Sequence, residues 1–217
     1  MEKHRGSQIM AIVALLLAVG GLSLGFAAFS QTLTIKSSAA VNPDANTFNV
    51  IFTNADQDGT SVTPTLSPAT GFTADTATIN NSDHDITGLK ANFTAPGQTA
   101  TYTFKAKNTG ELQAYLNRIT FNTVSGSSPA AAKVCTPGTG TTAALVTAAC
   151  DDISISVKVA DDPAYTASNG SITGHTLAVG ATENVVVTIT YAEGGDRADG
   201  DFTVAFGDVS LLYGSVD

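Results

Sequence analysis

The sequence predicts an all-β fold, an antiparallel β-sandwich of jelly-roll or Ig-like topology, preceded by an N-terminal apolar leader helix. Apolar and polar residues alternate in many segments, and these segments are separated by Gly, Pro, Asn and Asp. Thr and Val are abundant, and both favour strands over helices. After Phe29 no segment keeps a helical periodicity. The alternation itself does not choose between jelly-roll and Ig-like topology.

Composition limits the possible functions. The chain has 217 residues, enough for one sizeable domain. Charged residues make up only 13%, and the net charge is -9. Because no cluster of Lys and Arg is available to neutralise phosphates, the composition argues against nucleic-acid binding. The acidic balance is typical of a solvated, self-repelling extracellular surface.

Residues 1–27 are predicted to be a signal peptide or a membrane anchor. Two basic residues precede an uncharged run over 9–29, which is long enough to cross a hydrocarbon core of about 30 Å as a helix. The small-x-small pattern at 25–27 predicts cleavage between Ala27 and Ala28. A retained anchor is the alternative. Both interpretations place the remaining chain outside the cell.

The segment that follows, residues 28–41, is predicted to be a strand with one apolar face. Its apolar positions are Phe29, Leu33, Ile35, Ala39 and Val41. Serine, threonine and lysine side chains occupy the opposite face. The β-sandwich domain is expected to occupy residues 42–217.

Further strands are expected along this domain. They cover residues 47–53, 77–80, 86–93, 99–108, 112–124, 153–160, 183–192 and 201–214. Two parts of the domain are similar to each other, residues 95–107 and 178–191, and each has a glycine turn that leads into a long alternating strand. Duplication and independent recurrence of common turn chemistry both explain this similarity.

The two cysteines, Cys135 and Cys150, are expected to form a disulfide. They enclose a stretch rich in Gly, Thr and Ala, which is expected to be a flexible loop. In an oxidising compartment, closing a loop of this length stabilises a fold by about 3 kcal/mol. Two unpaired buried thiols are the alternative. A metal site needs more ligands than two distant cysteines.

The sequence contains no recognisable catalytic motif, so we expect the protein not to be an enzyme. It has no His-Glu-x-x-His helix, no G-x-S-x-G elbow and no phosphate-binding loop. His84 and His175 are far apart in loop-like contexts, where simple solvation is expected.

One segment resembles half of a calcium-binding loop, and no other cofactor is indicated. Asn54, Asp56 and Asp58 occupy positions 1, 3 and 5, with Gly59 at position 6. Position 12 is Thr65 instead of the bidentate Glu, so an ordinary Asp/Gly turn is the alternative. The acidic positions Asp196, Asp199 and Asp201 form a similar, weaker pattern.

Two stretches resemble the TasA/camelysin family of secreted bacterial matrix-fibre proteins, to which some archaeal bundling-pilus subunits are related. The leader exit, "GGLSLGFAAFS", is similar to signal sequences processed by SipW-type signal peptidases. Residues 88–121 are similar to the family's turn, strand, Asn-x-Gly and strand segment. Pro96-Gly97 and Asn108-Thr109-Gly110 stand at the matching points.

The resemblance implies a jelly-roll subunit of an extracellular fibre, pilus or biofilm matrix whose partners are copies of itself. In such assemblies the N-terminal segment of one subunit, here residues 28–41, fills a groove in the next by donor-strand exchange. Backbone hydrogen bonds would supply the adhesion, with Phe29, Leu33 and Ile35 setting the register. In the alternative, 28–41 is the domain's own first strand, and the protein is a membrane-anchored cell-surface module for adhesion or binding.

Overall fold

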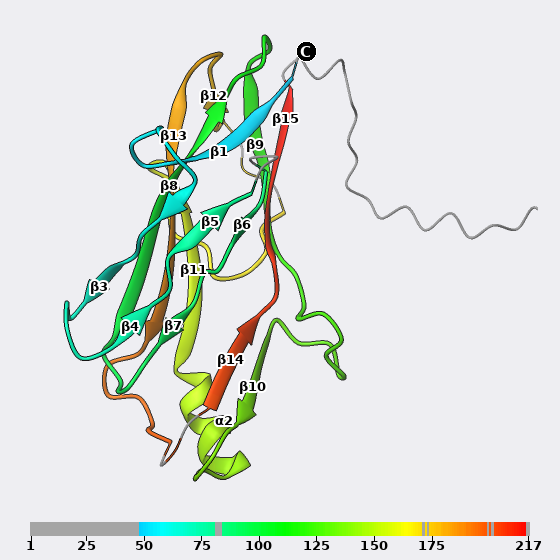
Figure 1. Ribbon diagram of the computed structural model, residues 1–217. Coiled ribbons are helices and arrows are strands. Elements are labelled where there is room, and N and C mark those ends of the chain that lie inside the picture. The colour runs from blue at the N-terminus through cyan, green and yellow to red at the C-terminus, as the bar shows by residue number, and fades with distance from the viewer. Residues whose placement is uncertain are drawn as a thin grey trace, which may run out of the picture. The chain divides into compact units, whose positions relative to one another are not determined.

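The computed structural model describes the domain that follows the predicted leader (Figure 1). The described residues are 48–80, 84–170, 172, 174–198, 200 and 202–215. The expected leader helix, the cleavage site at Ala27 and Ala28, and the strand at 28–41 lie outside them. The described part is mostly β, with several antiparallel sheets and one short helix, which confirms the all-β prediction.

The largest sheet forms one layer, called here the main sheet. Its strands are β1 (Val50–Asn54), β3 (Thr65–Ser67), β8 (Thr99–Asn108), β13 (Thr182–Tyr191) and β11 (Ile153–Val159). Their order is β1-β8-β13-β11, and all neighbours are antiparallel. β1 and β3 share one edge of β8: β3 pairs with the first half of β8 and β1 pairs with its second half. Each ten-residue central strand, β8 and β13, therefore has neighbours on both sides.

The opposing layer is divided into two parts. One part contains β12 (Thr176–Leu177), β9 (Ala114–Phe121) and β15 (Val209–Ser215), with the pair β10 (Lys133–Pro137) and β14 (Phe202–Phe206). The other part contains β2 (Ser61–Val62), β5 (Ala77–Ile79) and β6 (Ile86–Thr87), with the pair β4 (Thr73–Ala74) and β7 (Ala91–Asn92). Buried side chains from both parts and from the main sheet join in one hydrophobic cluster, as expected of a sandwich.

The two similar segments noticed in the sequence lie at the centre of the main sheet. The turn before each strand closes the far end of the other strand: Gly97 N–H donates to the Tyr191 carbonyl at 2.8 Å, and Gly180 N–H donates to the Asn108 carbonyl at 2.9 Å. Both glycines have a positive φ, 86° and 75°, which glycine adopts without steric cost. The similarity therefore describes two equivalent halves of the central strand pair.

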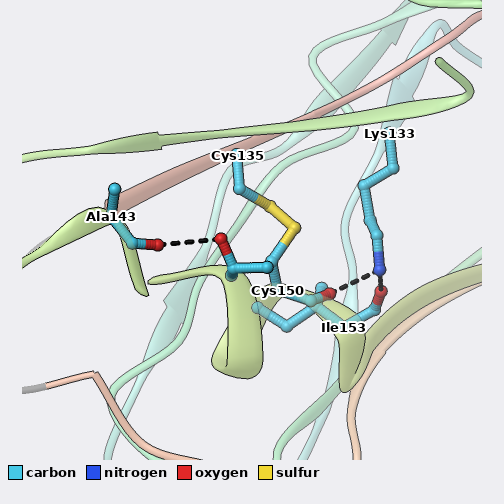
Figure 2. Close-up of a disulfide and its surroundings, with 6 residues drawn as sticks. Lys133, Cys135, Ala143, Cys150 and Ile153 are labelled. Atoms are coloured by element: carbon cyan, nitrogen blue, oxygen red, sulfur yellow. Dashed lines mark hydrogen bonds between the residues drawn. A yellow bond between two sulfur atoms is a disulfide. The ribbon is translucent and has the colours of Figure 1, made fainter. Parts of the chain in front are cut away.

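The predicted disulfide is present, but part of the segment between its cysteines, which was expected to be a flexible loop, is a helix. Cys135 and Cys150 are bonded, and the second half of the segment between them forms the helix α2 (Ala143–Asp151), which includes Cys150 (Figure 2). Thr142 caps the N-terminus by accepting from the Leu145 N–H, and the alanine-rich sequence favours a helix. Nine residues are too few to give a clear helical periodicity.

Lys133 holds the other end of this helix. Its ammonium donates to the carbonyls of Cys150 and Ile153, the latter at 2.7 Å, as Figure 2 shows. A cation beside the last carbonyls of a helix is favourable. Burial lowers the pKa of Lys133, while the charges of Asp151 and Asp152 act in the opposite direction.

No helix in the described part of the chain is long and apolar enough to cross a membrane.

Two expected strands are each broken in two. The segment 86–93 forms β6 and β7, and the segment 201–214 forms β14 and β15. Several short strands were not predicted, namely β2, β3, β4, β10 and β12. Most of them have only two or three residues, so their sequences contain no measurable alternation.

Candidate strand-binding groove

A groove separates the two parts of the divided layer. One lip is formed by residues 84–94, which include β6 and β7, and is called here the β6–β7 lip. The other is formed by residues 202–211, called the β14–β15 lip. Among the described residues each of these strands is hydrogen-bonded on one side only, so its second edge has no paired strand. In Figure 1 the red strand β15 runs beside β6 without pairing to it.

The floor of the groove is the apolar face of the main sheet. It is formed by Ile153, Ile155 and Val157 of β11 and by Val185, Val187 and Ile189 of β13, and Phe52 and Phe104 also line it. All of these side chains except Phe52 and Ile155 are buried. The groove has two adjoining parts of about 710 and 780 Å³. The groove therefore continues along much of the main sheet.

Alternate apolar side chains on both lips are only half-buried. On the β6–β7 lip they are Leu89, Ala91 and Phe93, and on the β14–β15 lip they are Phe202, Val204, Phe206, Val209 and Leu211. Each packs against the core on one side. At the strand rise of about 3.3 Å per residue, the β14–β15 lip spans about 33 Å. The groove thus has the length, the apolar floor and the two unpaired edges that suit an added β-strand.

The β14–β15 lip is held by the strands behind it. β15 pairs with β9 and β14 pairs with β10, so one nearly continuous strand faces two successive partners. Between these partners, Asn122 N–H donates to the Asp208 carbonyl and Gly207 N–H donates to the Ala132 carbonyl, both at 2.9 Å. A Cβ at Gly207 would lie 1.8 Å from the Asn122 carbonyl oxygen. Only glycine fits at this close approach of two backbones.

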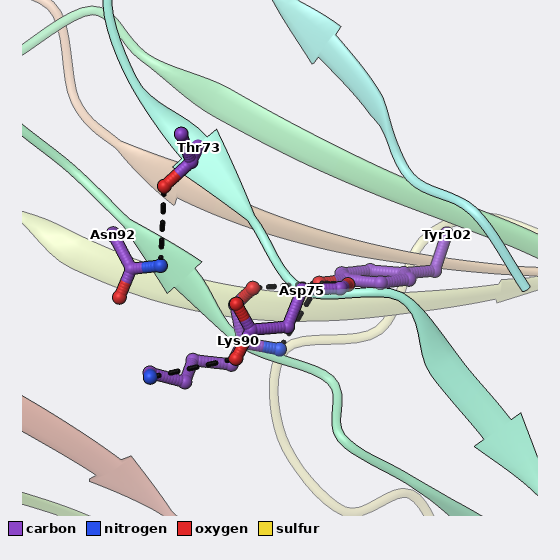
Figure 3. Close-up of polar contacts among 5 residues, drawn as sticks. All are labelled: Thr73, Asp75, Lys90, Asn92 and Tyr102. Carbon is purple, nitrogen blue, oxygen red and sulfur yellow. Dashed lines mark hydrogen bonds and ion pairs between the residues drawn. The ribbon is translucent and has the colours of Figure 1, made fainter.

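Tyr102 attaches the β6–β7 lip to the main sheet (Figure 3). Its buried hydroxyl lies 2.9 Å from the Asp75 carbonyl and 2.7 Å from the Lys90 carbonyl, and it accepts from the Lys90 N–H at 3.0 Å. Burial raises the pKa of Tyr102; the Lys90 hydrogen bond opposes this shift and the Asp75 charge adds to it. The Lys90–Asp75 ion pair is exposed and contributes little.

The expectation that His175 is solvated is wrong. Its side chain is only 10% exposed and lies between two carboxylates, with Nδ1 2.9 Å from Asp162 and Nε2 beside Glu183. Tyr213 of β15 also contacts Glu183, and burial followed by the Glu183 charge raises the pKa of Tyr213. This network ties the far end of β15 to β13.

The proposed half-calcium loop forms a hydrogen-bonded turn. The Asn54 carboxamide oxygen accepts from the N–H groups of Asp58 and Gly59, at 3.0 and 3.3 Å, and its amide donates to the Asp58 carboxylate. Asp56 is exposed. Among the described residues no group of three His, Cys, Asp or Glu is placed to hold a metal ion. Asp199 and Asp201 of the weaker acidic pattern lie outside the described residues.

The predicted polymerisation residues, Phe29, Leu33, Ile35, Ala39 and Val41, also lie outside the described residues. Comparison with known proteins adds no assignment: no family model, no curated protein and no solved structure matches this chain.

Proposed function

We propose that the protein is a structural subunit of an extracellular fibre, pilus or biofilm matrix, assembled by donor-strand exchange. The observation that carries this proposal is the apolar groove between two unpaired strand edges. Residues 28–41 of one copy are the proposed occupant of the groove in another copy. No catalytic role is proposed.

The groove and the segment match in chemistry. An unpaired edge offers N–H and C=O groups that an added strand can satisfy, and each lip offers one such edge. The segment has a single apolar face to turn toward the floor and a polar face to turn toward solvent. At about 3.3 Å per residue it would span about 46 Å, enough to fill the groove. Its insertion would join the two parts into one layer, completing a sandwich of jelly-roll or Ig-like topology.

Other features support an exported polymer. The leader pattern and the disulfide suit an oxidising extracellular compartment. While an uncleaved leader holds residue 28 at the membrane, the segment is not free to pair with another subunit. The resemblance of residues 88–121 to the TasA/camelysin family favours the same proposal.

The alternative function is a membrane-anchored surface module whose groove is filled by its own residues 28–41. It is favoured by covalent connection, because the segment is joined to β1 through only residues 42–49. In this case the protein would act as a monomeric adhesion or binding module.

Two double variants, which add the same charge to opposite faces of the segment, test the proposal. Leu33→Asp with Ile35→Asp places two carboxylates against the apolar floor, where each lost apolar side chain contributes about 1.5–3 kcal/mol. The control, Thr32→Asp with Thr34→Asp, adds the same charge on the polar face. We expect only the first variant to sediment as a folded monomer with an unchanged melting temperature.

Two results would contradict donor-strand exchange. If the variant with Leu33→Asp and Ile35→Asp is a monomer that melts at a much lower temperature than the wild type, residues 28–41 are the domain's own strand. Filaments that persist after deletion of residues 28–41 would show that assembly uses another surface.

A further inference from the structure

Within the proposed fibre, we infer that the donated strand runs antiparallel to β14–β15 of the acceptor. The end of one subunit at which β1 begins, called the upper end, then meets the end of the next subunit that carries the helix α2, called the lower end. This inference rests on the proposed function and adds the direction of the strand and the surfaces that meet. It follows from where the described chain begins and from the directions of the two lips.

The upper end is the end at which the described chain begins. The Asn49 carbonyl accepts from the Thr109 N–H at 2.8 Å, just beyond the end of β8. Ser215, at the end of β15, pairs with Ala114 near the same loop. The turn before β13, which includes the exposed Val179, lies there as well.

The lower end carries the helix α2 and the turn that precedes β8. The helix leads directly into Ile153, which pairs with Tyr191 at the last position of β13. Gly97 N–H donates to the carbonyl of the same Tyr191. Asp196 N–H donates to the Asp152 carboxylate at 2.7 Å, which places the loop after β13 at this end too.

The two lips run in opposite directions between these ends. The β14–β15 lip begins at Phe202 near Tyr191, at the lower end, and β15 ends at the upper end. The β6–β7 lip runs the other way, because residues 84–88 line the groove with Val185 and residues 91–94 line it with Tyr191. An inserted strand is therefore antiparallel to one lip and parallel to the other.

The connection between segment and domain limits where residue 41 can lie. From residue 41 to residue 48 an extended chain reaches only about 23 Å. Residue 41 of a donor therefore lies within about 23 Å of residue 48, so the lower end of its own groove, about 33 Å along the lip, is out of its reach. This holds whichever groove the segment enters.

Only one strand direction continues an open fibre. If the strand is antiparallel to β14–β15, residue 41 lies at the acceptor's lower end, and the acceptor's upper end stays free to donate in turn. If it is parallel, two upper ends meet and crowd the exit of the acceptor's own segment, which favours a closed, reciprocally exchanged pair. A segment folded back into its own groove would also be parallel to β14–β15, because residue 41 would stay at its own upper end.

Photocrosslinking in filaments tests the direction. A photoreactive residue replaces Thr32 in one variant and Ser38 in another, both on the polar face of the segment. Each variant is mixed as a minority into isotopically heavy wild-type subunits, so a link to a heavy peptide joins two copies. A photoreactive residue at Thr103, exposed on the outer face of β8, is the control and should link to neither lip.

We expect position 32 to link to heavy peptides containing residues 84–87 or 209–211, and position 38 to those containing 91–94 or 202–204. The reversed pattern between copies would overturn the inferred direction and leave donor-strand exchange intact. Links to the lips within one copy, or no link to either lip, would overturn both the direction and the fibre proposal.

Discussion

The main sheet and the divided layer use similar residues with different outcomes. In β8 and β13, alternating apolar side chains are almost fully buried, and each strand pairs along both edges. On the two lips of the groove, alternating apolar side chains are half-buried, and one edge of each strand has no partner in the described part. This difference is what the proposed function requires, with a main sheet that stabilises the subunit and a divided layer that is completed by assembly.

Two phenylalanines in these regions provide the largest expected contrast. Phe104 of β8 is 2% exposed and packs against Phe52 with ring centroids 5.2 Å apart, whereas Phe206 on the β14–β15 lip is half-buried. We expect Phe104→Ala to lower the free energy of unfolding of the monomer by about 3–5 kcal/mol. Phe206→Ala should lower it by about 1–2 kcal/mol, because only part of its ring loses contacts.

The same two variants should rank differently in assembly. Urea unfolding measures stability in a monomeric background, and sedimentation measures filament formation. Phe206→Ala should reduce filament yield more than its effect on stability explains. If both variants affect assembly only in proportion to stability, the division between a stabilising sheet and a binding layer is wrong.

A glycine at the middle of the β14–β15 lip provides a second contrast. Gly207→Ala places a methyl group against the Asn122 carbonyl and should cost about 1–3 kcal/mol while disturbing the lip. Gly170→Ala is the matched control, since a Cβ there meets no atom within 4 Å. Urea unfolding and filament yield should change for the first variant alone. If both variants change urea unfolding and filament yield equally, the close approach of Gly207 to the Asn122 carbonyl does not stabilise the lip.

The smallest expected effect concerns Tyr102 at alkaline pH. Because its pKa is raised in the folded state, its contribution to stability is complete below pH of about 10 and is lost as the pH rises above that value. Tyr102→Phe should cost about 1 kcal/mol at pH 7 by removing the hydroxyl from the Asp75 and Lys90 backbone. The variant should also lose less stability than the wild type between pH 9 and pH 11. Urea unfolding at pH 9 and pH 11 measures this loss of stability for both proteins. An equal loss in the variant and the wild type would contradict the prediction.

The main sheet could be predicted from the sequence because its strands are long and buried on one face. The segment 99–108 is predicted with the bounds of β8, and 153–160 and 183–192 differ from β11 and β13 by one residue. The disulfide followed from two cysteines and an exported context. In these cases the information is local to the segment.

The groove could not be predicted in the same way, because an unpaired edge is defined by a neighbour that is missing. Nothing in the alternation of 201–214 distinguishes a lip from an interior strand, although Gly207 and Asp208 mark its break. The burial of His175 was also missed, since its two carboxylate partners, Asp162 and Glu183, approach from other elements. Both features depend on tertiary contacts that a local pattern does not contain.

Amide hydrogen exchange tests the central claim most directly, by comparing wild-type filaments with the Leu33→Asp, Ile35→Asp monomer. If residues 28–41 of another copy fill the groove, backbone amides at 86–92 and 202–211 should be protected in filaments and exchange faster in the monomer. Amides of β8 and β13 should be equally protected in both states. Equal exchange of the lips in filaments and monomer, or new protection confined to other strands, would contradict the claim that the groove is the assembly site.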